Sequence, residues 1–307
     1  MRILVTGGHG FVGRHVVAAL DAAGADVTTT YHPDSSPVPG LPAESSPVDL
    51  EDAPAVAVAA RGAGAVVHLA ARAGGIHLQE RADPDLFHVN RRITDNVLAA
   101  CVAHRIPRLF LASSQVIYRP SASPLDEGDP QVGIADDPSP YAWSKVCDEV
   151  VARWVPEVEA VVGRLGNVYG PGAPFEVDRS TVIHALIGRA MDLEDGASLQ
   201  VWGSGSTVRS FVFVEDVARA VALILRVGEA GAAYNVDTGR PVSIGDLAAA
   251  VVREVNPSVT IDFDPSKPAG LPFRVAAIDR LAALGFTPEV DLDEGLQRTV
   301  AWYRANR

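Results

Sequence analysis

The chain has 307 residues, of which 48% are hydrophobic and 21% charged, a composition that excludes a disordered or fibrous protein. Its 38 acidic and 26 basic residues give a formal net charge of −12, which argues against surfaces for nucleic acid or anionic membranes. Cys101 and Cys147 are too few and too far apart for a disulfide framework or a zinc site. This cysteine usage fits a reducing cytoplasm and predicts no bound metal, and no apolar stretch approaches the ~20 residues of a membrane span, so we expect a cytoplasmic protein.

Short apolar runs alternate with helical patterns through the first half of the chain, and they predict strands and helices respectively. The expected strands are residues 3–6, 26–31, 65–70, 109–113 and 158–165, and the expected helices are 11–23, 54–60, 83–104 and 141–154. Strands that are apolar on both faces and separated by helices indicate a parallel sheet covered on both sides. We therefore expect an α/β fold, a doubly wound Rossmann sheet whose ligand crevice lies beyond the carboxyl ends of the strands.

The remaining segments are less regular. Residues 33–47, rich in Pro and Ser, predict a surface loop that is neither a helix nor an inner strand. Residues 119–140, crowded with Pro, Asp and Gly after a strand, predict a lid or rim. After about Gly166 the pattern becomes shorter, with helices expected at 182–191, 215–227, 244–255 and 292–305. This predicts a first domain over residues 1–166 and a smaller lobe over 167–307, with some segments returning to the first domain.

A glycine-rich segment, TGGHGFVG, follows the first expected strand and opens the first expected helix. Glycines at Gly7, Gly10 and Gly13 permit a tight turn, close approach of the backbone to a pyrophosphate, and close packing of helix on strand. The amino terminus of the helix, with Phe11 and Val12, offers unpaired N–H groups to phosphates. This context predicts dinucleotide binding by the first domain, leaving the second lobe mainly for a substrate; a purely structural turn is the alternative.

The end of the second expected strand carries the residues that discriminate NAD from NADP. An acid there binds the ribose hydroxyls of NAD, and a basic residue favours NADP. The sequence has Tyr31 and His32 instead, and His32 is either a partner for a 2′-phosphate or a solvent-facing turn residue, so both cofactors stay open. Asp49, which precedes Leu50, is either an acceptor for the adenine amine or the cap of a helix that begins at Glu51.

Tyr141 and Lys145 lie four residues apart at the start of an expected helix, so both project from one face. Ser113 and Ser114 end the fourth expected strand and face the same crevice. A phenol with an ammonium and an oxidised nicotinamide nearby favours the phenolate, which takes a proton from an alcohol while hydride leaves the same carbon. The hydroxyl of Ser114 would hold the substrate oxygen. Beside the dinucleotide motif, this set predicts an oxidoreductase.

Together these residues resemble the extended short-chain dehydrogenases/reductases, in the branch that modifies nucleotide sugars. The resemblance covers essentially the whole chain and rests on separated motifs at residues 6–13, 67–71, 113–118, 141–145, 164–170 (RLGNVYG), 208–217 (VRSFVFVEDV) and the ending LGF…EGL…TVAWY. Within this branch the sequence is most similar to the GDP-L-fucose synthases. The matching segments are a Gly-Gly-Ile loop in residues 73–76 and nucleotide-binding segments at residues 201–205 and 266–270.

The resemblance implies roles for further residues. It places Asp49 at the adenine, Leu69 and Ala70 at the nicotinamide ribose, and Val168 at the carboxamide, and the expected cofactor set also includes Leu50, Ala71 and Ser113. It implies that Asn167, Trp202 and Arg209 hold the sugar nucleotide, with Lys267 and Arg274 as further candidates. An arginine suits a diphosphate because its fork bonds two oxygens at once. Ordinary packing for Trp202 and a surface salt bridge for Arg209 are the alternatives.

The chain departs from that family at the residues for ring inversion. The synthases use a cysteine two residues after the serine and a later histidine, where this chain has Val116 and Thr181. We expect His184, three residues on, to be a packing residue rather than a replacement. The related 4,6-dehydratases carry Asp-Glu after the catalytic hydroxyl, where this chain has Gln115 and Val116. Inversion and dehydration are therefore disfavoured, and redox chemistry at the fourth sugar carbon remains.

We accordingly expect an NAD(P)H-dependent reductase of a nucleotide-linked 4-keto sugar. A nucleotide-sugar 4-epimerase that retains NAD would use the same residues and is the close alternative, and a non-catalytic dinucleotide sensor is a third. The family often dimerises through two helices of each subunit, which match residues 83–104 and 141–154 here. Apolar side chains on these helices (Phe87, Ile93, Val97, Val146 and Val150) would form either a homodimer interface or intramolecular core.

Overall fold

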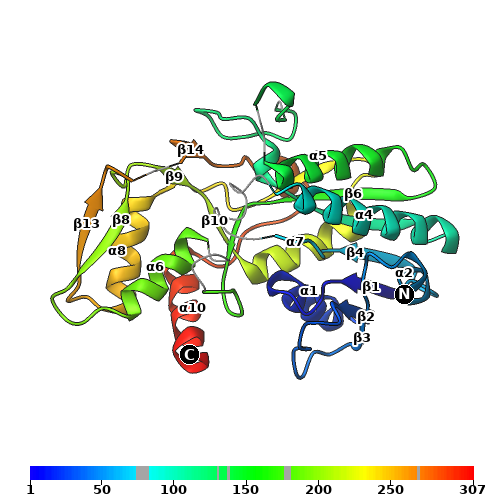
Figure 1. Cartoon of the computed structure of the whole chain (residues 1–307), viewed down its shortest axis with the longest axis horizontal. Coiled ribbons are helices and arrows are strands. Elements are labelled where there is room, and N and C mark those ends of the chain that lie inside the picture. The colour runs from blue at the N-terminus through cyan, green and yellow to red at the C-terminus, as the bar shows by residue number, and fades with distance from the viewer. Residues whose placement is uncertain (74–82, 130, 137–138, 176–180, 268–269) are drawn as a thin grey trace.

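A parallel sheet forms the centre of the molecule in this computed structural model, which describes residues 1–73, 83–129, 131–136, 139–175, 181–267 and 270–307 (Figure 1). In the described residues the sheet has seven strands in the order β11-β6-β5-β4-β1-β2-β3. Their bounds are β1 Arg2–Thr6, β2 Asp26–Tyr31, β3 Glu44–Pro47, β4 Ala65–His68, β5 Arg108–Ser114, β6 Glu159–Leu165 and β11 Ala233–Val236. All neighbouring strands pair in parallel, so the carboxyl ends of β1, β4, β5 and β6 meet at one edge. The expected doubly wound fold is confirmed.

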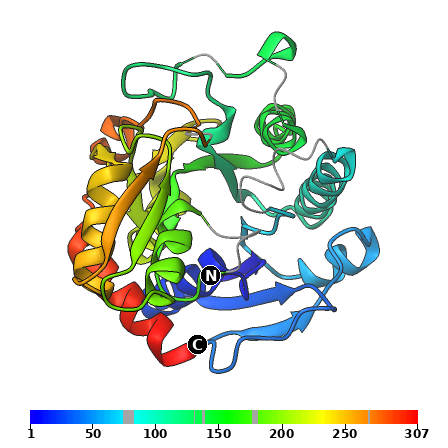
Figure 2. The same cartoon turned by 60° about the vertical axis from the view of Figure 1, so that its left-hand side comes forward.

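Helices cover both faces of this sheet. Helices α1 (Phe11–Ala22) and α7 (Val214–Val227) pack together on one face, where Val16, Val17 and Val221 join the buried cluster. Helices α2 (Ala53–Ala59), α4 (Pro84–His104) and α5 (Pro140–Arg153) cover the other face, and Figure 2 shows α4 and α5 side by side. The sequence left open whether Ile93 and Val97 face a second subunit or the interior of the chain. Both are buried in the intramolecular core. Neither residue is free to contact a second subunit.

A second lobe lies beside the sheet, on the left in Figure 1. Its described residues form three small sheets, built from β7 (Asn167–Tyr169), β8 (Ser198–Trp202), β9 (Val208–Arg209), β10 (Phe211–Phe213), β12 (Val242–Ser243), β13 (Thr260–Asp264) and β14 (Phe273–Arg274). Helices α6 (Val182–Met191), α8 (Ile244–Val255) and α10 (Leu292–Asn306) pack around a buried cluster of their own, and the short α9 spans Asp279–Ala283. Among the described residues, no helix is long and apolar enough to cross a lipid bilayer.

Two expectations from the sequence need correction. The loop expected over residues 33–47 ends in the strand β3, which pairs with β2 at the edge of the sheet. An edge strand tolerates Pro47 because one side of its backbone needs no ladder partner. The strand expected over residues 65–70 ends at His68, so Leu69 and Ala70 leave the sheet. The expected helices begin and end within one residue of the observed bounds, as at α1 and α7.

Candidate active site

The glycine-rich loop joins β1 to α1 at the carboxyl edge of the sheet. Gly7 has a φ of 74°, and a Cβ there would lie 2.9 Å from the backbone of Ala70. A Cβ on Gly13 would lie 2.1 Å from the carbonyl oxygen of Gly7, so only glycine lets the helix approach the loop this closely. Gly10 begins α1 without a side-chain cap, and no acid occupies the first turn. The N–H groups beside Phe11 are therefore available to an anion.

His9 in this loop is a residue that the sequence reasoning missed. Its Nδ1 accepts a hydrogen bond from the backbone N–H of Val38 at 2.7 Å, and its Nε2 lies 2.9 Å from Oγ of Ser45. The ring also packs edge-on against Tyr31, with centroids 4.8 Å apart. Burial, and then the charge of Arg14, lower the pKa of His9. A neutral His9 thus fastens the segment between β2 and β3 onto the glycine-rich loop.

The residues expected at the adenosine end lie after β2 and β3. His32 is exposed, and its Nδ1 accepts a hydrogen bond from the N–H of Asp34 at 3.2 Å, as in a turn. Asp49 is exposed and accepts from the N–H of Glu51 at 2.9 Å. The cap of α2 is Asp52, so the reading of Asp49 as a helix cap is wrong. Because of the local turn around Asp49, helix α2 begins only at Ala53, and the Asp49 carboxylate stays at the surface.

Tyr141 and Lys145 lie one turn apart at the start of α5, where Ser139 caps the helix by accepting from the N–H of Ala142. Nζ of Lys145 lies 5.9 Å from the centre of the Tyr141 ring. The ammonium is buried and donates to the carbonyl oxygen of Ala112 at 3.0 Å. Because Ala112 precedes the end of β5 by two residues, this bond fixes α5 against the strand that carries Ser114.

The two serines at the end of β5 differ in their surroundings. Ser113 is buried, and its Oγ has no hydrogen-bond partner in the described part of the chain. Ser114 is partly exposed, and its Oγ accepts from the N–H of Val116 at 3.3 Å. Leu69, Ala70 and Ala71 follow the neighbouring strand β4 at the same edge. The structure therefore brings the two serines and Leu69, Ala70 and Ala71 together along the ends of β4 and β5, and Lys145 of α5 reaches the same strand at Ala112.

A series of polar side-chain contacts that the sequence did not reveal lies at the carboxyl edge of the sheet. Oγ1 of Thr6, at the end of β1, lies 2.7 Å from Nδ1 of His68, at the end of β4. Nε2 of His68 lies 3.3 Å from Oγ1 of Thr94 on α4. Burial, and then the charge of Lys145, lower the pKa of His68 to about 3, so the imidazole is neutral. No local spacing predicts such a series, because its members come from three distant elements.

Two arginines of the second lobe are neighbours. Arg209 of β9 and Arg274 of β14 occupy the same register position of a parallel pair. Burial, and then the charge of Arg274, lower the pKa of Arg209 to about 10, and burial also lowers the pKa of Arg274. The ion pairs of the described residues include neither arginine, so the surface salt bridge considered for Arg209 is not found there. Two partly buried cations without a carboxylate among the described residues would favour an anion beside them.

The other expected substrate residues lie on nearby strands of this lobe. Asn167 of β7 donates from Nδ2 to the carbonyl oxygen of Ser210 at 2.8 Å, and Val168 follows it in the same strand. Trp202 ends β8 and is 48% exposed, opposite Asp264 of the parallel strand β13. Lys267 is exposed shortly after β13. Residues 74–76 of the expected Gly-Gly-Ile loop and residues 268–269 of the second nucleotide-binding segment lie outside the described residues.

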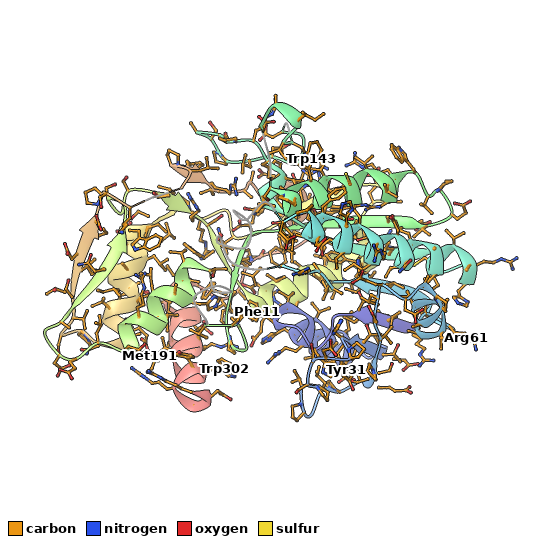
Figure 3. All side chains as sticks on the ribbon, viewed as in Figure 1. Phe11, Tyr31, Arg61, Trp143, Met191 and Trp302 are labelled. Atoms are coloured by element: carbon orange, nitrogen blue, oxygen red, sulfur yellow. The ribbon has the colours of Figure 1, made fainter. Side chains whose placement is uncertain are left out.

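His184 is a packing residue. It is 1% exposed on α6, and its ring contacts Phe175 and Phe11 with centroids 5.2 and 5.9 Å away. Figure 3 shows Phe11 at the start of α1, where it faces the second lobe. Nδ1 of His184 lies 2.9 Å from Oγ1 of Thr181, and burial lowers the pKa of His184 to about 3. Val116 lies in the short helical turn Gln115–Ile117 after β5 and brings no ionisable group to it.

The fold and the site define the class as an NAD(P)-dependent oxidoreductase of the short-chain dehydrogenase/reductase type. The model of the NAD dependent epimerase/dehydratase family matches residues 3–237, and the chain belongs to this family. A dTDP-4-dehydro-6-deoxy-D-allose reductase of Streptomyces is 31% identical over 99% of this chain and 97% of its own length. GDP-L-fucose synthase 1 of Arabidopsis thaliana is 31% identical over 78% of this chain and 77% of its own length. These relatives confirm the resemblance to nucleotide-sugar reductases.

Solved structures give the same result. The UDP-glucose 4-epimerase of Thermus thermophilus, in complex with NAD, has a TM-score of 0.85 and 31% identity, with all of both chains covered. DesIV of Streptomyces venezuelae, a dTDP-glucose 4,6-dehydratase with NAD bound, has a TM-score of 0.85 and 28% identity over 100% of this chain and 98% of its own. The nicotinamide dinucleotide expected from the glycine-rich loop is therefore the cofactor of this enzyme type.

Proposed function

We propose that this enzyme reduces a nucleotide-linked 4-keto sugar to the 4-hydroxy sugar. A bound reduced nicotinamide supplies the hydride. Tyr141 donates the proton to the sugar oxygen, Ser114 orients the carbonyl, and Lys145 positions the ribose and favours ionisation of Tyr141. The observation that carries the proposal is the buried Lys145, held by Ala112 at the end of β5 with its ammonium 5.9 Å from the Tyr141 ring. The Streptomyces reductase supports the 4-keto substrate class because its similarity extends over 99% of this chain.

The arginine pair provides the proposed diphosphate site. Arg209 and Arg274 lie side by side, and a diphosphate supplies two negative groups to cations that lack a carboxylate in the described residues. Asn167 would contact the sugar end, and the half-exposed Trp202 and Lys267 would contact the nucleoside end. Residues 1–166 would then hold mainly the dinucleotide and residues 167–307 mainly the sugar nucleotide.

A 4-epimerase is the second candidate, favoured by the likeness to the Thermus enzyme that was solved with NAD. An epimerase must keep its nucleotide while the sugar is a transient ketone, whereas a reductase exchanges it at each turnover. We therefore suggest denaturing the purified protein and measuring the released nucleotide. A reductase is expected to release little and to consume NADH or NADPH with dTDP-4-dehydro-6-deoxy-D-allose. Stoichiometric NAD, with interconversion of 4-hydroxy epimers, would contradict the reductase. A protein that binds dinucleotide and does neither would be a sensor.

The proposed cofactor contacts follow the length of the dinucleotide. Gly7, Gly10, Phe11, Val12 and Gly13 would bind the diphosphate of NAD or NADP. Tyr31, His32, Asp49 and Leu50 would border the adenosine, and Leu69, Ala70, Ala71, Ser113 and Val168 the nicotinamide half. The turn that occupies Nδ1 of His32 leaves its Nε2 for a 2′-phosphate, so parallel titrations with NADPH and NADH decide the preference.

A homodimer through α4 and α5 and a cytoplasmic location complete the proposal. The helices expose an apolar groove of about 340 Å³ near their amino ends, lined by Pro84, Phe87, His88, Pro140, Trp143 and Cys147. Figure 3 shows Trp143 at the start of α5. A second copy would cover this groove with the same groove. Light scattering of the protein and of Trp143→Glu tests this: a dimer that becomes a monomer supports it, and a monomeric parent chain contradicts it.

A further inference from the structure

The ammonium of Lys145 lies beside a buried ion cluster that the proposed chemistry does not use. Asp148, one helical turn further along α5, is fully buried, and its Oδ2 lies 3.4 Å from Nζ of Lys145. Its Oδ1 forms an ion pair with Arg91 of α4, and Thr94 adds a side-chain hydrogen bond. Arg91 is 12% exposed at its side chain and also pairs with Asp95, which is 55% exposed. Charges of alternating sign thus run from the lysine to the surface.

This carboxylate is costly to keep in the interior. Removing a charge from water costs several kcal/mol, and an apolar side chain of similar volume avoids that cost. Burial raises the pKa of Asp148, while the charges of Lys145 and Arg91 act in the opposite direction. Ala112 accepts from only one of the three N–H groups of Lys145, and a neutral acceptor could serve a second N–H without the cost of a buried charge. The position of the carboxylate therefore points to an effect on the lysine.

The geometry of the ammonium shows what that effect is. An ammonium has three N–H groups, of which one points to Ala112 and another to Asp148. With two directions fixed by different elements, the direction of the third N–H is fixed as well. This third N–H is the one left for a further hydrogen-bond partner.

The other ionisable groups near Lys145 carry little free charge. His68 is neutral because burial and the charge of Lys145 lower its pKa to about 3. Burial also raises the pKa of the Cys147 thiol, which stays uncharged. Glu149, on the β6 side of α5, forms two hydrogen bonds with Arg164, so these charges offset one another. The ion cluster is thus the buried charge that acts most directly on the lysine within the described residues.

We propose that Asp148 and Arg91 are positioning residues for Lys145. Asp148 fixes the direction of the ammonium, and Arg91 offsets the negative charge of Asp148 so that the lysine still favours ionisation of Tyr141. The proposal rests on the proposed function, in which Tyr141 gives up its proton. It predicts that the two residues act with opposite sign, because one removes and the other adds positive potential at Tyr141.

The test compares Asp148→Asn and Arg91→Gln with the parent chain. In the reduction of dTDP-4-dehydro-6-deoxy-D-allose, kcat/KM falls at high pH once Tyr141 has lost its proton. Asp148→Asn removes a negative charge, so this fall should move to lower pH, by about one unit. Arg91→Gln removes a positive charge and should move it to higher pH. The matched control is Asp95→Asn, whose exposed charge is screened by water and should move it by much less.

A second readout needs no turnover and separates this proposal from the substrate assignment. The ultraviolet absorbance of tyrosinate is titrated in each variant and in the same variant carrying Tyr141→Phe, so that the difference reports Tyr141 alone. Opposite shifts for the two variants support the proposal even if the sugar is not a substrate. Shifts of the same sign, or none in either folded variant, overturn it and assign the cluster to helix packing. If Asp148→Asn does not fold, Arg91→Gln still decides by the sign of its shift.

Discussion

Lys145 and Arg164 are buried beside carboxylates, whereas Arg209 and Arg274 are desolvated beside one another. Hydrogen bonds and charge from Glu149 raise the pKa of Arg164, although burial acts against them. For Arg209 burial lowers the pKa, and the neighbouring arginine lowers it further. Arg164, whose charge is offset by its own carboxylate, belongs to the internal framework, while a cation pair without a carboxylate favours an anion from outside. The contrast separates the catalytic helix from the substrate lobe.

The largest expected effect concerns the paired cations. Glu149→Gln leaves Arg164 buried without its carboxylate and should lower the free energy of unfolding by about 3–5 kcal/mol. The control is Asp293→Asn, which breaks the exposed pair with Arg253 and should cost less than about 1 kcal/mol. Urea denaturation of the three proteins measures both. Equal losses in the two variants would remove the distinction between buried pairs and surface pairs.

Replacing one of the unpaired arginines should have a smaller effect, a weaker binding of nucleotide. It should leave the free energy of unfolding unchanged or raise it, the opposite of the change expected for Glu149→Gln. Arg209→Met removes a charge-assisted contact to a diphosphate and should weaken the binding of dTDP, UDP or GDP by about 10- to 100-fold. The free protein should be as stable or more stable, because a like-charge contact with Arg274 is lost. Calorimetric titration and thermal unfolding measure the two quantities, with the exposed Arg253→Met as control. Unchanged nucleotide affinity with lowered stability would make Arg209 a structural cation.

The smallest expected effect is a pH dependence of stability that comes from two buried, neutral histidines. His68 and His184 have pKa values of about 3 in the folded chain, against about 6.5 when unfolded. Between these values the unfolded chain binds more protons, so stability falls as the pH falls below about 6.5. Between pH 7 and 5.5 the parent should lose about 1 kcal/mol more than His184→Gln. A constant difference between the two proteins would mean that His184 titrates alike in the folded and unfolded chains, so that folding does not lower its pKa.

The sequence was sufficient for the fold because its signals are local. Apolar runs and helical periodicity placed β2, α6 and α8 at their observed bounds, and the glycine spacing found the loop at Gly7. The segment before Val48 was expected to be a loop, but it pairs with β2 as the edge strand β3. The sequence does not show this because edge pairing depends on a strand that is distant along the chain.

The site was only partly predictable. The Tyr141–Lys145 spacing is helical, so its geometry follows from the sequence. The contacts of His9 with Val38 and of Asp148 with Arg91 join elements whose packing no local pattern encodes. The resemblance named Arg209 and Arg274 separately, and only the register of β9 and β14 makes them a pair.

The most direct test of the central claim follows the hydride. The parent chain is incubated with nicotinamide cofactor deuterated at its transferable position and with dTDP-4-dehydro-6-deoxy-D-allose, and the product sugar is examined by magnetic resonance. The account predicts one deuterium at the fourth carbon, and product formation that falls about 10²- to 10⁴-fold in Tyr141→Phe while cofactor affinity is nearly unchanged. Undiminished deuterium transfer by Tyr141→Phe, or product without deuterium at that carbon, would contradict it.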